Sequence, residues 1–302
     1  MKDKLIVSMK GFCMGMADVI PGVSGGTMAF ILGIYEQLLA AIKSFDNLWL
    51  KYVVTLQIKP AIQRPHFGFL IPLVIGIGSA LVFFTRVVPL PSLLHTNPEV
   101  VYGLFFGLIV GSIIVLLPET GKQDGKSFAL LAFGTLLGYL VVTLVPMNTP
   151  DALWFIFLSG MLAISAMLLP GISGSFILLI LNKYDTVLNA IGHFNFTILV
   201  PFGLGALSGL VVFSRVLSWL LARFHRPMLL IIIGILIGSL WKIWPFQVRL
   251  YEVIHGKEKL ISSEPVFPKC WSEQVTYALV MMLLGFAIVL MIHRIAKNKS
   301  SE

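Results

Sequence analysis

Long apolar runs separated by short polar segments make up most of this chain of 302 residues. Six of the runs are close to the ~20 residues that a helix needs to cross the hydrocarbon core of a bilayer. We therefore expect six membrane-spanning helices, over residues 67–86, 98–118, 127–146, 197–222, 226–245 and 274–295. The polar segment from Gln247 to Glu273 is expected to be the only sizeable excursion outside the membrane.

Two further apolar segments, residues 4–42 and 151–192, are interrupted by the same motif, Pro-Gly-x-Ser-Gly. It occurs at residues 21–25 and again at residues 170–174. Proline lacks an amide hydrogen and glycine loses backbone entropy in a helix, so both copies are expected to stop a helix. The polar backbone groups freed at membrane depth need partners, and such breaks are therefore expected in protein-lined cavities.

The composition confirms that the runs belong to an integral membrane protein, since 57% of the residues are hydrophobic and 12% are charged, against roughly 25% charged in soluble proteins. The net charge of +8 comes from basic residues scattered over short loops, which argues against a nucleic-acid partner. Cys13 and Cys270 are far apart and lack the spacing of a zinc site, so neither a metal site nor a disulfide is expected.

The two halves of the chain align with each other well beyond the motif. Aligning the two prolines places Tyr35-Glu36 on Tyr184-Asp185. Further aligned pairs are Gly11 with Gly160, Pro72 with Pro201, Gly76 with Gly205, Ser79 with Ser208, Arg86 with Arg215 and Pro118 with Pro245. Such pairs at constant order predict a duplication, with repeat 1 over residues 1–146 and repeat 2 over residues 147–302.

The distribution of positive charge decides whether the broken segments cross the membrane. If both are re-entrant hairpins, 14 of the 22 basic residues fall on the cytoplasmic side: Lys2, Lys4, Lys10, Lys43, Lys51, Lys59, Arg64, Lys122, Lys126, Arg223, Arg226, Arg294, Lys297 and Lys299. If both cross, this bias disappears. Three crossings per half then invert the second half, so we expect an all-α inverted repeat of two units, each a re-entrant helical hairpin plus three membrane-spanning helices, with both termini cytoplasmic.

The two motif tips are candidate anion sites, because a helix restarting after each Ser-Gly presents unpaired amides and partial positive charge. Hydroxyl groups beside them can also donate hydrogen bonds to phosphate oxygens. The candidate phosphate-binding residues are Ser24, Gly25, Gly26, Thr27, Ser173, Gly174 and Ser175. The alternative is that each serine caps its own helix and the glycines permit close packing.

Charged side chains add further candidates. Arg86 and Arg215 end equivalent helices, where a guanidinium can grip a lipid phosphate or extend to the membrane surface as an ordinary anchor. Asp18 lies three residues before Pro21, and a carboxylate at that depth is a candidate for coupling to a proton or a sodium ion. Glu36 and Asp185 are weaker candidates for ion coupling, since both are expected near opposite surfaces.

The sequence also permits an enzymatic interpretation, because Gly22-Val23-Ser24-Gly25-Gly26 matches the G-x-S-x-G signature of serine hydrolases. That signature requires a strand-to-helix elbow and a base within reach. Here both flanks are expected to be helical, and the histidines fall in loops or at segment ends. We therefore predict a transporter rather than an enzyme, with a lipid phosphatase or transferase as the enzymatic alternative.

The residues Gly15 to Thr27, followed by Ile34-Tyr35-Glu36 and the second motif at Pro170 to Gly174, resemble the bacterial polyprenyl-phosphate transporter family called PopT. The resemblance covers nearly the whole chain. It implies a multi-pass protein of the bacterial cytoplasmic membrane whose partner is a polyprenyl-phosphate lipid.

Membership would imply a flippase that returns undecaprenyl phosphate from the outer to the inner leaflet for reuse in peptidoglycan and other envelope polymers. It would assign phosphate recognition to the two tips, with the two arginines as helpers and no cofactor beyond a coupling ion. A secondary transporter of a small organic or inorganic anion stays open as an alternative, because the same tips permit it.

Overall fold

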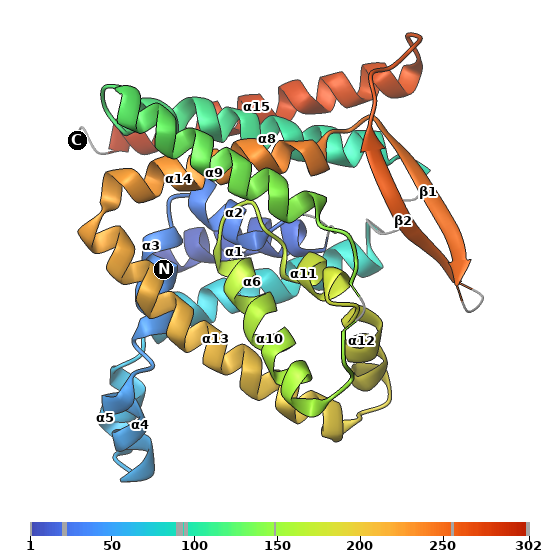
Figure 1. The fold of residues 1–302 in the computed structure, drawn as a ribbon. Helices are drawn as coiled ribbons and strands as arrows, with labels where there is room; N and C mark the ends of the chain where they lie inside the picture. The colour runs from blue at the N-terminus through green and yellow to red at the C-terminus, as the bar shows by residue number, and fades with distance from the viewer. Residues whose placement is uncertain are drawn as a thin grey trace. The chain divides into compact units, whose positions relative to one another are not determined.

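The computed structural model describes the whole chain except residues 1, 20–22, 89–92, 94–95, 148, 255–256 and 300–302, together with the side chains of residues 2, 85, 249–263 and 295–299. Pro21 and Gly22 of the first motif therefore lie outside the described residues. Most of the described chain is helical (Figure 1).

Six described helices are long and apolar enough to cross a membrane, which confirms the prediction from the apolar runs. They are α6 (Phe67–Arg86), α8 (Pro98–Glu119), α9 (Gly125–Thr143), α13 (Phe196–Arg223), α14 (His225–Ile243) and α15 (Glu273–Lys299). Pro72 and Pro201 lie inside α6 and α13, about one turn from each N-terminal end, where few helical hydrogen bonds are lost.

Each broken segment contains three helices. The first has α1 (Lys2–Asp18), α2 (Gly25–Ile31) and α3 (Tyr35–Lys43), and the second has α10 (Leu153–Leu168), α11 (Gly174–Ile180) and α12 (Tyr184–Gly192). The sequence predicted the break at the motif but not the second one, where α3 turns by 118° from α2. Gly33 and Asn182 adopt left-handed backbone angles there, with φ of 66° and 51°, and these two residue types tolerate that conformation best.

Two segments outside the predicted spans are also ordered. After α3, the helices α4 (Asn47–Val54) and α5 (Ile58–Gln63) form a short helical pair. The polar excursion folds into an antiparallel hairpin of β1 (Gln247–Ile254) and β2 (Lys257–Pro265) (Figure 1). The all-α class therefore describes the membrane-spanning part, whereas the alternation of polar Gln247 and Arg249 with apolar Val248 and Leu250 favours a strand outside it.

The chain forms two compact units that do not coincide with the two sequence halves. The first unit comprises Met1–Pro89 and Leu144–Ile232, and the second comprises Leu90–Thr143 and Ile233–Glu302. Each unit therefore takes elements from both halves. Both broken segments lie in the first unit, together with α6 and α13.

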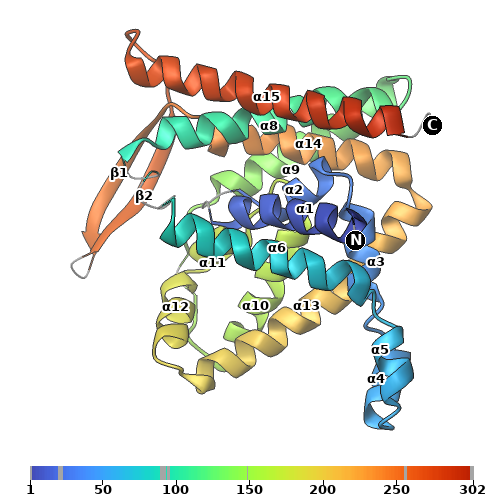
Figure 2. The same cartoon turned by 180° about the vertical axis from the view of Figure 1, so that it is seen from behind.

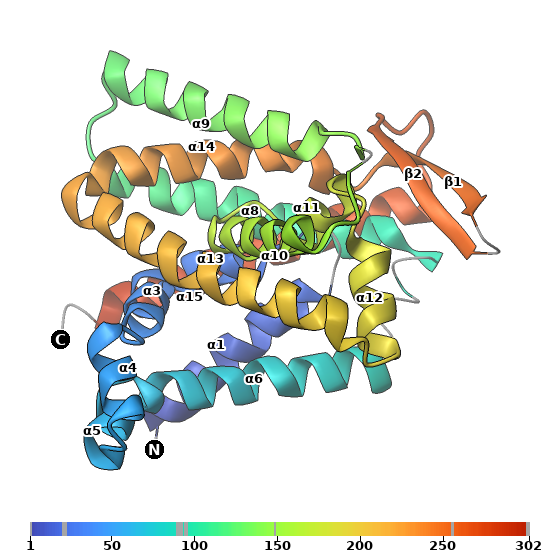
Figure 3. The same ribbon diagram turned by 60° about the horizontal axis from the view of Figure 1, so that its bottom comes forward.

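In the first unit, α1 packs along α6 and α10 packs along α13 (Figures 2 and 3). The two pairs share one register. A Cβ added at Gly11 would meet the Leu73 carbonyl oxygen, and a Cβ added at Gly160 would meet that of Phe202. Gly11 aligns with Gly160 and Leu73 with Phe202, so equivalent positions touch in both pairs.

At a second contact, aligned positions again touch in both pairs, but the glycine lies on the other helix of the pair. A Cβ on Gly15 of α1 would lie 2.9 Å from the Cβ of Ala80, whereas a Cβ on Gly209 of α13 would lie 2.8 Å from Cγ2 of Ile164. Ile164 aligns with Gly15, and Gly209 aligns with Ala80. The small residue that permits close approach is thus on α1 in one pair and on α13 in the other.

The second unit packs its helices by the same means. A Cβ on Gly103 of α8 would lie 2.7 Å from the Ala278 carbonyl oxygen of α15, and a Cβ on Gly138 of α9 would lie 2.6 Å from that of Ile235 in α14. Close backbone approach through small residues is typical of helices in a bilayer, where the lipid provides no hydrophobic driving force.

Candidate functional site

The first motif tip is closed by the chain's own groups. Ser24 caps α2 through its Oγ, which accepts a hydrogen bond from the Gly26 amide at 3.2 Å. The Gly25 amide donates to Oδ1 of Asp18 at 2.8 Å, and the Thr27 amide donates to the Ser24 carbonyl at 3.0 Å. Ser24 and Thr27 are each 2% exposed. In this conformation the first amides of α2 are satisfied, and Asp18 provides the negative charge that a helix N-terminus attracts.

The second motif tip has a different hydrogen-bond pattern. Ser173 precedes α11 but its side chain makes no capping bond to that helix. Its Oγ instead lies 2.8 Å from Oγ of Ser175, which is half-buried. Within the described part of the chain, no hydrogen-bond partner accounts for the amides of Gly174 and Ser175. Met167 stands at the position that aligns with Asp18, so the counterpart of the Asp18 carboxylate is missing from this tip.

The two tips touch each other. Oγ1 of Thr27 accepts a hydrogen bond from the Gly171 amide at 2.7 Å. The hydroxyl of Ser24 lies 3.4 Å from the Met167 carbonyl oxygen, and a Cβ added at Gly26 would lie 2.5 Å from that oxygen. The structure therefore brings candidate residues of both motifs into one cluster, and Gly26 faces the Met167 carbonyl too closely to admit a side chain without a shift.

Tyr35 adds a contact that sequence analysis did not identify. Its hydroxyl donates to the Leu168 carbonyl at 2.6 Å, and the residue is 3% exposed. Leu168 is the last residue of α10, whose final carbonyls have no partner within their own helix. The first broken segment thus caps the helix that leads to the second tip. The signal for it in the sequence was the aligned pair of tyrosines, Tyr35 and Tyr184.

A buried lysine was also missed. Lys183, at the second break of its segment, is 1% exposed, and its Nζ donates to the Thr149 carbonyl at 3.1 Å and to Oδ1 of Asp151 at 2.6 Å. The Nζ also lies 5.8 Å from the centre of the Phe155 ring. In the first segment the Leu32 carbonyl at the equivalent break accepts from Nζ of Lys10 at 2.8 Å. A lysine inside an apolar segment was the signal that could have identified both.

The two predicted arginines do not reach this cluster. Arg86 is exposed at the C-terminal end of α6. Arg215 is half-buried and donates to the carbonyls of Val211 at 3.2 Å and Phe45 at 3.3 Å. Phe45 follows α3, so Arg215 holds the far end of the first broken segment rather than its tip.

The remaining acidic candidates lie apart from the tips as well. Glu36 is exposed, and its Oε1 lies 3.0 Å from Nε2 of His225. Asp185 is exposed at the start of α12. Asp18, by contrast, contacts the first tip through the Gly25 amide.

The chemistry of the cluster is that of neutral donors beside one carboxylate. Hydroxyls and backbone amides provide its hydrogen bonds, and these groups bind phosphate or carboxylate oxygens without a large cost of burying a cation. In the described part of the chain, no group of three or more His, Cys, Asp or Glu side chains could hold a metal ion. The arrangement can accept an anion where the amides of the second tip are free of partners.

Comparison with known proteins places this geometry in a family. The model of the undecaprenyl phosphate translocase-like family matches residues 14–261. A polyprenyl-phosphate transporter of Vibrio cholerae serotype O1 is 35% identical over 298 residues, which is 96% of each chain. A polyprenyl-phosphate transporter of Staphylococcus aureus is 34% identical over 265 residues, 80% of this chain and 87% of its own. No solved structure matches this chain. On these matches, the chain belongs to the undecaprenyl phosphate translocase-like family.

Proposed function

We propose that this protein carries undecaprenyl phosphate from the outer to the inner leaflet of the bacterial cytoplasmic membrane, so that the carrier lipid is reused in envelope synthesis. The observation that carries the proposal is the meeting of two motif tips through Thr27 and Gly171, which brings the candidate phosphate-binding residues of both broken segments together. The family and the names of the two relatives support the choice of a polyprenyl phosphate as the substrate.

The architecture that we propose for this function is an inverted repeat with two re-entrant hairpins. The helix lengths support it, because α1 has 17 residues and α10 has 16. At ~1.5 Å per residue each is about 25 Å long, short of the ~30 Å hydrocarbon core. The second arms are shorter still and are bent again at Gly33 and Asn182. The shared register of the α1–α6 and α10–α13 pairs supports the duplication.

For the phosphate, we propose that the second tip is the first contact. The amides of Gly174 and Ser175 and the hydroxyls of Ser173 and Ser175 donate to the phosphate oxygens. Donors of this kind recognise an oxyanion by geometry as well as by charge. The polyprenyl tail stays in the lipid phase while the headgroup is held by the protein.

Asp18 provides the coupling step in this proposal. In the closed state its carboxylate accepts from the Gly25 amide. A proton on that carboxylate weakens the hydrogen bond, because bonds to a charged acceptor are about twice as strong as neutral ones. The amides of α2 then become available to the same phosphate, so that proton binding at Asp18 and phosphate binding at the tips favour each other.

The test uses proteoliposomes that contain a fluorescent polyprenyl phosphate and a membrane-impermeant quencher. The wild-type protein is expected to exchange the lipid between leaflets with the lipid chemically unchanged, and the variant S173A/S175A is expected to lose most of this exchange. Full exchange by that variant would contradict the proposed site.

The same preparation separates the alternatives. Release of free phosphate from the lipid would identify an enzyme instead. Uptake of a water-soluble organic or inorganic anion without lipid exchange would identify a secondary anion transporter. Failure of the wild-type protein to exchange the lipid under a proton gradient of either sign would overturn the proposed function itself.

A further inference from the structure

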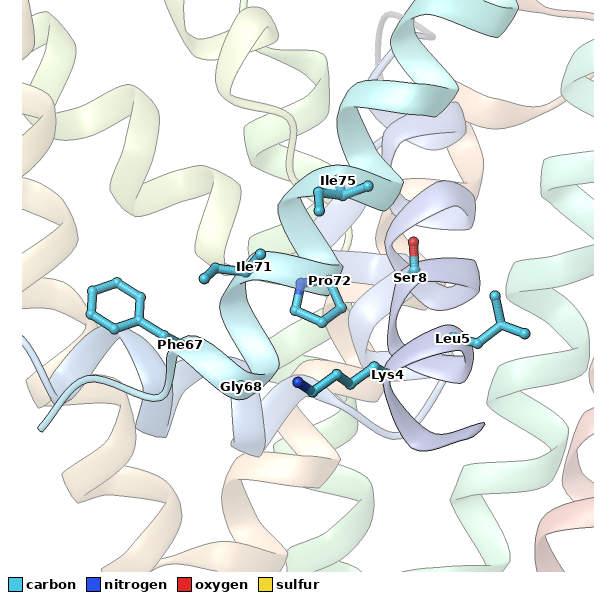
Figure 4. Close-up of a pocket in the computed structure, with 8 residues that line it drawn as sticks. All are labelled: Lys4, Leu5, Ser8, Phe67, Gly68, Ile71, Pro72 and Ile75. Carbon is cyan, nitrogen blue, oxygen red and sulfur yellow. The ribbon is translucent and has the colours of Figure 1, made fainter. Parts of the chain in front are cut away.

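A groove lies between α1 and α6, away from the two tips (Figure 4). Its volume is about 500 Å³, which falls in the ~300–1,000 Å³ range of sites that hold small molecules or parts of larger ones. The walls are largely apolar and are formed by side chains such as Leu5, Phe67, Ile71 and Ile75. Leu5, Ile71 and Ile75 are 64%, 54% and 61% exposed, so other parts of the protein leave these wall side chains largely uncovered.

Two polar side chains of α1 lie on one side of this groove. Lys4 is exposed and extends toward Gly68 at the start of α6, and Ser8 lies one turn farther along α1 (Figure 4). Gly68 leaves room for a ligand, since a Cβ added there would have no atom within 4 Å. The groove therefore combines a cation and a hydroxyl at its surface end with an apolar channel toward the interior of the membrane.

The duplicated pair α10–α13 lacks these features at the aligned positions. It has the same packing register, but Leu153 stands where α1 has Lys4, and Phe157 stands where α1 has Ser8. On α13, Thr197 replaces Gly68. The cation, the hydroxyl and the open glycine are thus all specific to one copy. Features that packing alone required would be expected in both copies, so the difference points to a ligand at one membrane surface only.

The chemistry of the groove suits a lipid with an anionic headgroup, such as a phosphate monoester, and a hydrocarbon chain. A single lysine provides a compact positive charge for a terminal phosphate. A channel bounded by two helices in close contact accepts one chain along Ile71 and Ile75. The groove is open along its side, as a ligand whose remaining chain stays in the bilayer requires.

We propose that the α1–α6 groove is a second binding site for the polyprenyl phosphate, with Lys4 and Ser8 on the phosphate and the isoprenoid chain nearest to it along Ile71 and Ile75. The proposal rests on the proposed function for the identity of the lipid. Under the proposed topology the Lys4 end faces the cytoplasm, so the groove receives the lipid after it has left the two tips. This gives the duplicated transporter different sites at its two surfaces.

The test uses a diazirine-labelled polyprenyl phosphate in phosphatidylcholine proteoliposomes, with labelled peptides identified by mass spectrometry. The wild-type protein is expected to be labelled on peptides of α1 and α6. Gly68→Leu is expected to reduce that labelling at least about tenfold, because added carbons must displace the chain. Lys4→Gln is expected to reduce it about fivefold, the effect of one lysine near an anionic phosphate.

Gly78→Leu is the matched control. Gly78 lies on the same helix, a Cβ added there also meets no atom within 4 Å, and it does not line the groove. Its labelling is expected to equal that of the wild type. Since Gly68 and Gly78 are equally open, both leucine variants are expected to fold, and their thermal unfolding in detergent checks this directly.

Two outcomes would overturn the groove while leaving the proposed function intact. The first is undiminished labelling of α1 and α6 in Gly68→Leu, with leaflet exchange still present. The second concerns competition at the wild-type groove. If phosphatidylglycerol abolishes labelling at the same concentration at which unlabelled polyprenyl phosphate does, the groove is a general lipid site. If the wild-type protein neither exchanges the lipid nor is labelled by it anywhere, the proposed function fails together with the groove.

Discussion

The two motif tips share the sequence Pro-Gly-x-Ser-Gly but differ in how their hydrogen bonds are satisfied. At the first tip the Ser24 hydroxyl caps α2 and Asp18 binds the Gly25 amide. At the second tip the Ser173 hydroxyl turns to Ser175 and leaves its helix uncapped. The same local motif therefore produces a closed helix end in one copy and an open one in the other.

The cause of the difference lies in two substitutions between the copies. Asp18 aligns with Met167, so only the first tip has a carboxylate for its helix. Gly26 aligns with Ser175, so only the second tip has an extra hydroxyl beside the capping serine. Two copies of one motif can thus meet and still differ in how the start of the helix that follows each of them is satisfied.

Substituting Gly26 by serine, the residue type at the aligned position 175, is expected to have the largest effect on leaflet exchange of the lipid. Gly26→Ser places a side chain 2.5 Å from the Met167 carbonyl oxygen, and overpacking at a backbone contact costs about 1–3 kcal/mol of unfolding free energy. The tips cannot meet, and leaflet exchange is expected to fall to the background rate. The measurement is exchange in proteoliposomes with thermal unfolding in parallel.

The reciprocal change, Ser175→Gly, separates the two tips. It removes a hydroxyl and introduces no clash, so the unfolding temperature is expected to stay close to that of the wild type while exchange is reduced. Equal loss of stability in both variants would show that the tips do not differ as described.

Alanine at the two motif serines is expected to give the next largest effect, with opposite signatures. Ser173→Ala removes a donor for the charged phosphate, worth about 1.5–3 kcal/mol or roughly 10- to 100-fold in exchange rate, with little change in stability. Ser24→Ala removes a helix cap and is expected to lower the unfolding free energy by about 1 kcal/mol. Exchange rates and unfolding curves of both variants check the contrast, and an exchange defect confined to Ser24→Ala would reverse it.

Neutralising Asp18 tests whether its hydrogen bond with the Gly25 amide keeps the first tip closed. Asp18→Asn keeps the size of the side chain but replaces a charged acceptor by a neutral one, which is expected to cost about 1 kcal/mol of stability. The dependence of leaflet exchange on a proton gradient is expected to disappear. Met167→Leu, the matched change at the second tip, conserves volume and is expected to leave that dependence in place. A proton dependence that persists in Asp18→Asn would exclude Asp18 as the coupling residue.

The smallest effect is expected outside both tips, at the anchor of α4 and α5. The Arg64 guanidinium and the Trp49 amide, both hydrogen-bonded to Asp46, hold the pKa of that carboxyl well below its usual range. The folded pKa is depressed, so the stabilisation is fully present above pH ~4, the ordinary pKa of an aspartate. It is lost as the pH falls through the lowered pKa.

Hydrogen exchange of the α4 amides, corrected for intrinsic rates, is expected to accelerate below pH ~4 relative to pH 7, and Asp46→Asn is expected to remove the pH dependence. Leaflet exchange at pH 7 serves as the internal control for this region, since α4 and α5 pack mainly against each other. Acceleration in the asparagine variant as large as in the wild type would assign the effect to another group.

The sequence alone was sufficient to predict the helices and breaks that depend only on nearby residues. The six spanning helices follow from the length of the apolar runs, and the breaks before Ser24 and Ser173 follow from proline and glycine. The second breaks at Gly33 and Asn182 were missed because neither carries a proline, and an isolated glycine or asparagine occurs in many helices without ending them. The β-hairpin after α14 was missed because its polar segment was assigned only by its lack of a membrane span.

The candidate site residues also divide into those that the sequence identifies and those that only the contacts in the structure reveal. The seven motif residues and Asp18 were identifiable because glycine, serine and an intramembrane carboxylate carry chemistry wherever the chain places them. The arginines were identified from their aligned positions at the ends of equivalent helices, and Arg215 donates to the carbonyl of Phe45. Tyr35 and Lys183 were overlooked because their roles are contacts with carbonyls 133 and 34 residues away in sequence.

By itself the sequence determined that the chain lies in a membrane, where its spanning helices run and where two of its segments must break. Those properties depend on hydrophobicity and backbone chemistry within about 20 residues. Only the tertiary structure decided that the two tips meet. The reason is that the meeting depends on the contacts of Ser24 with Met167 and of Thr27 with Gly171, which join residues 143 and 144 positions apart.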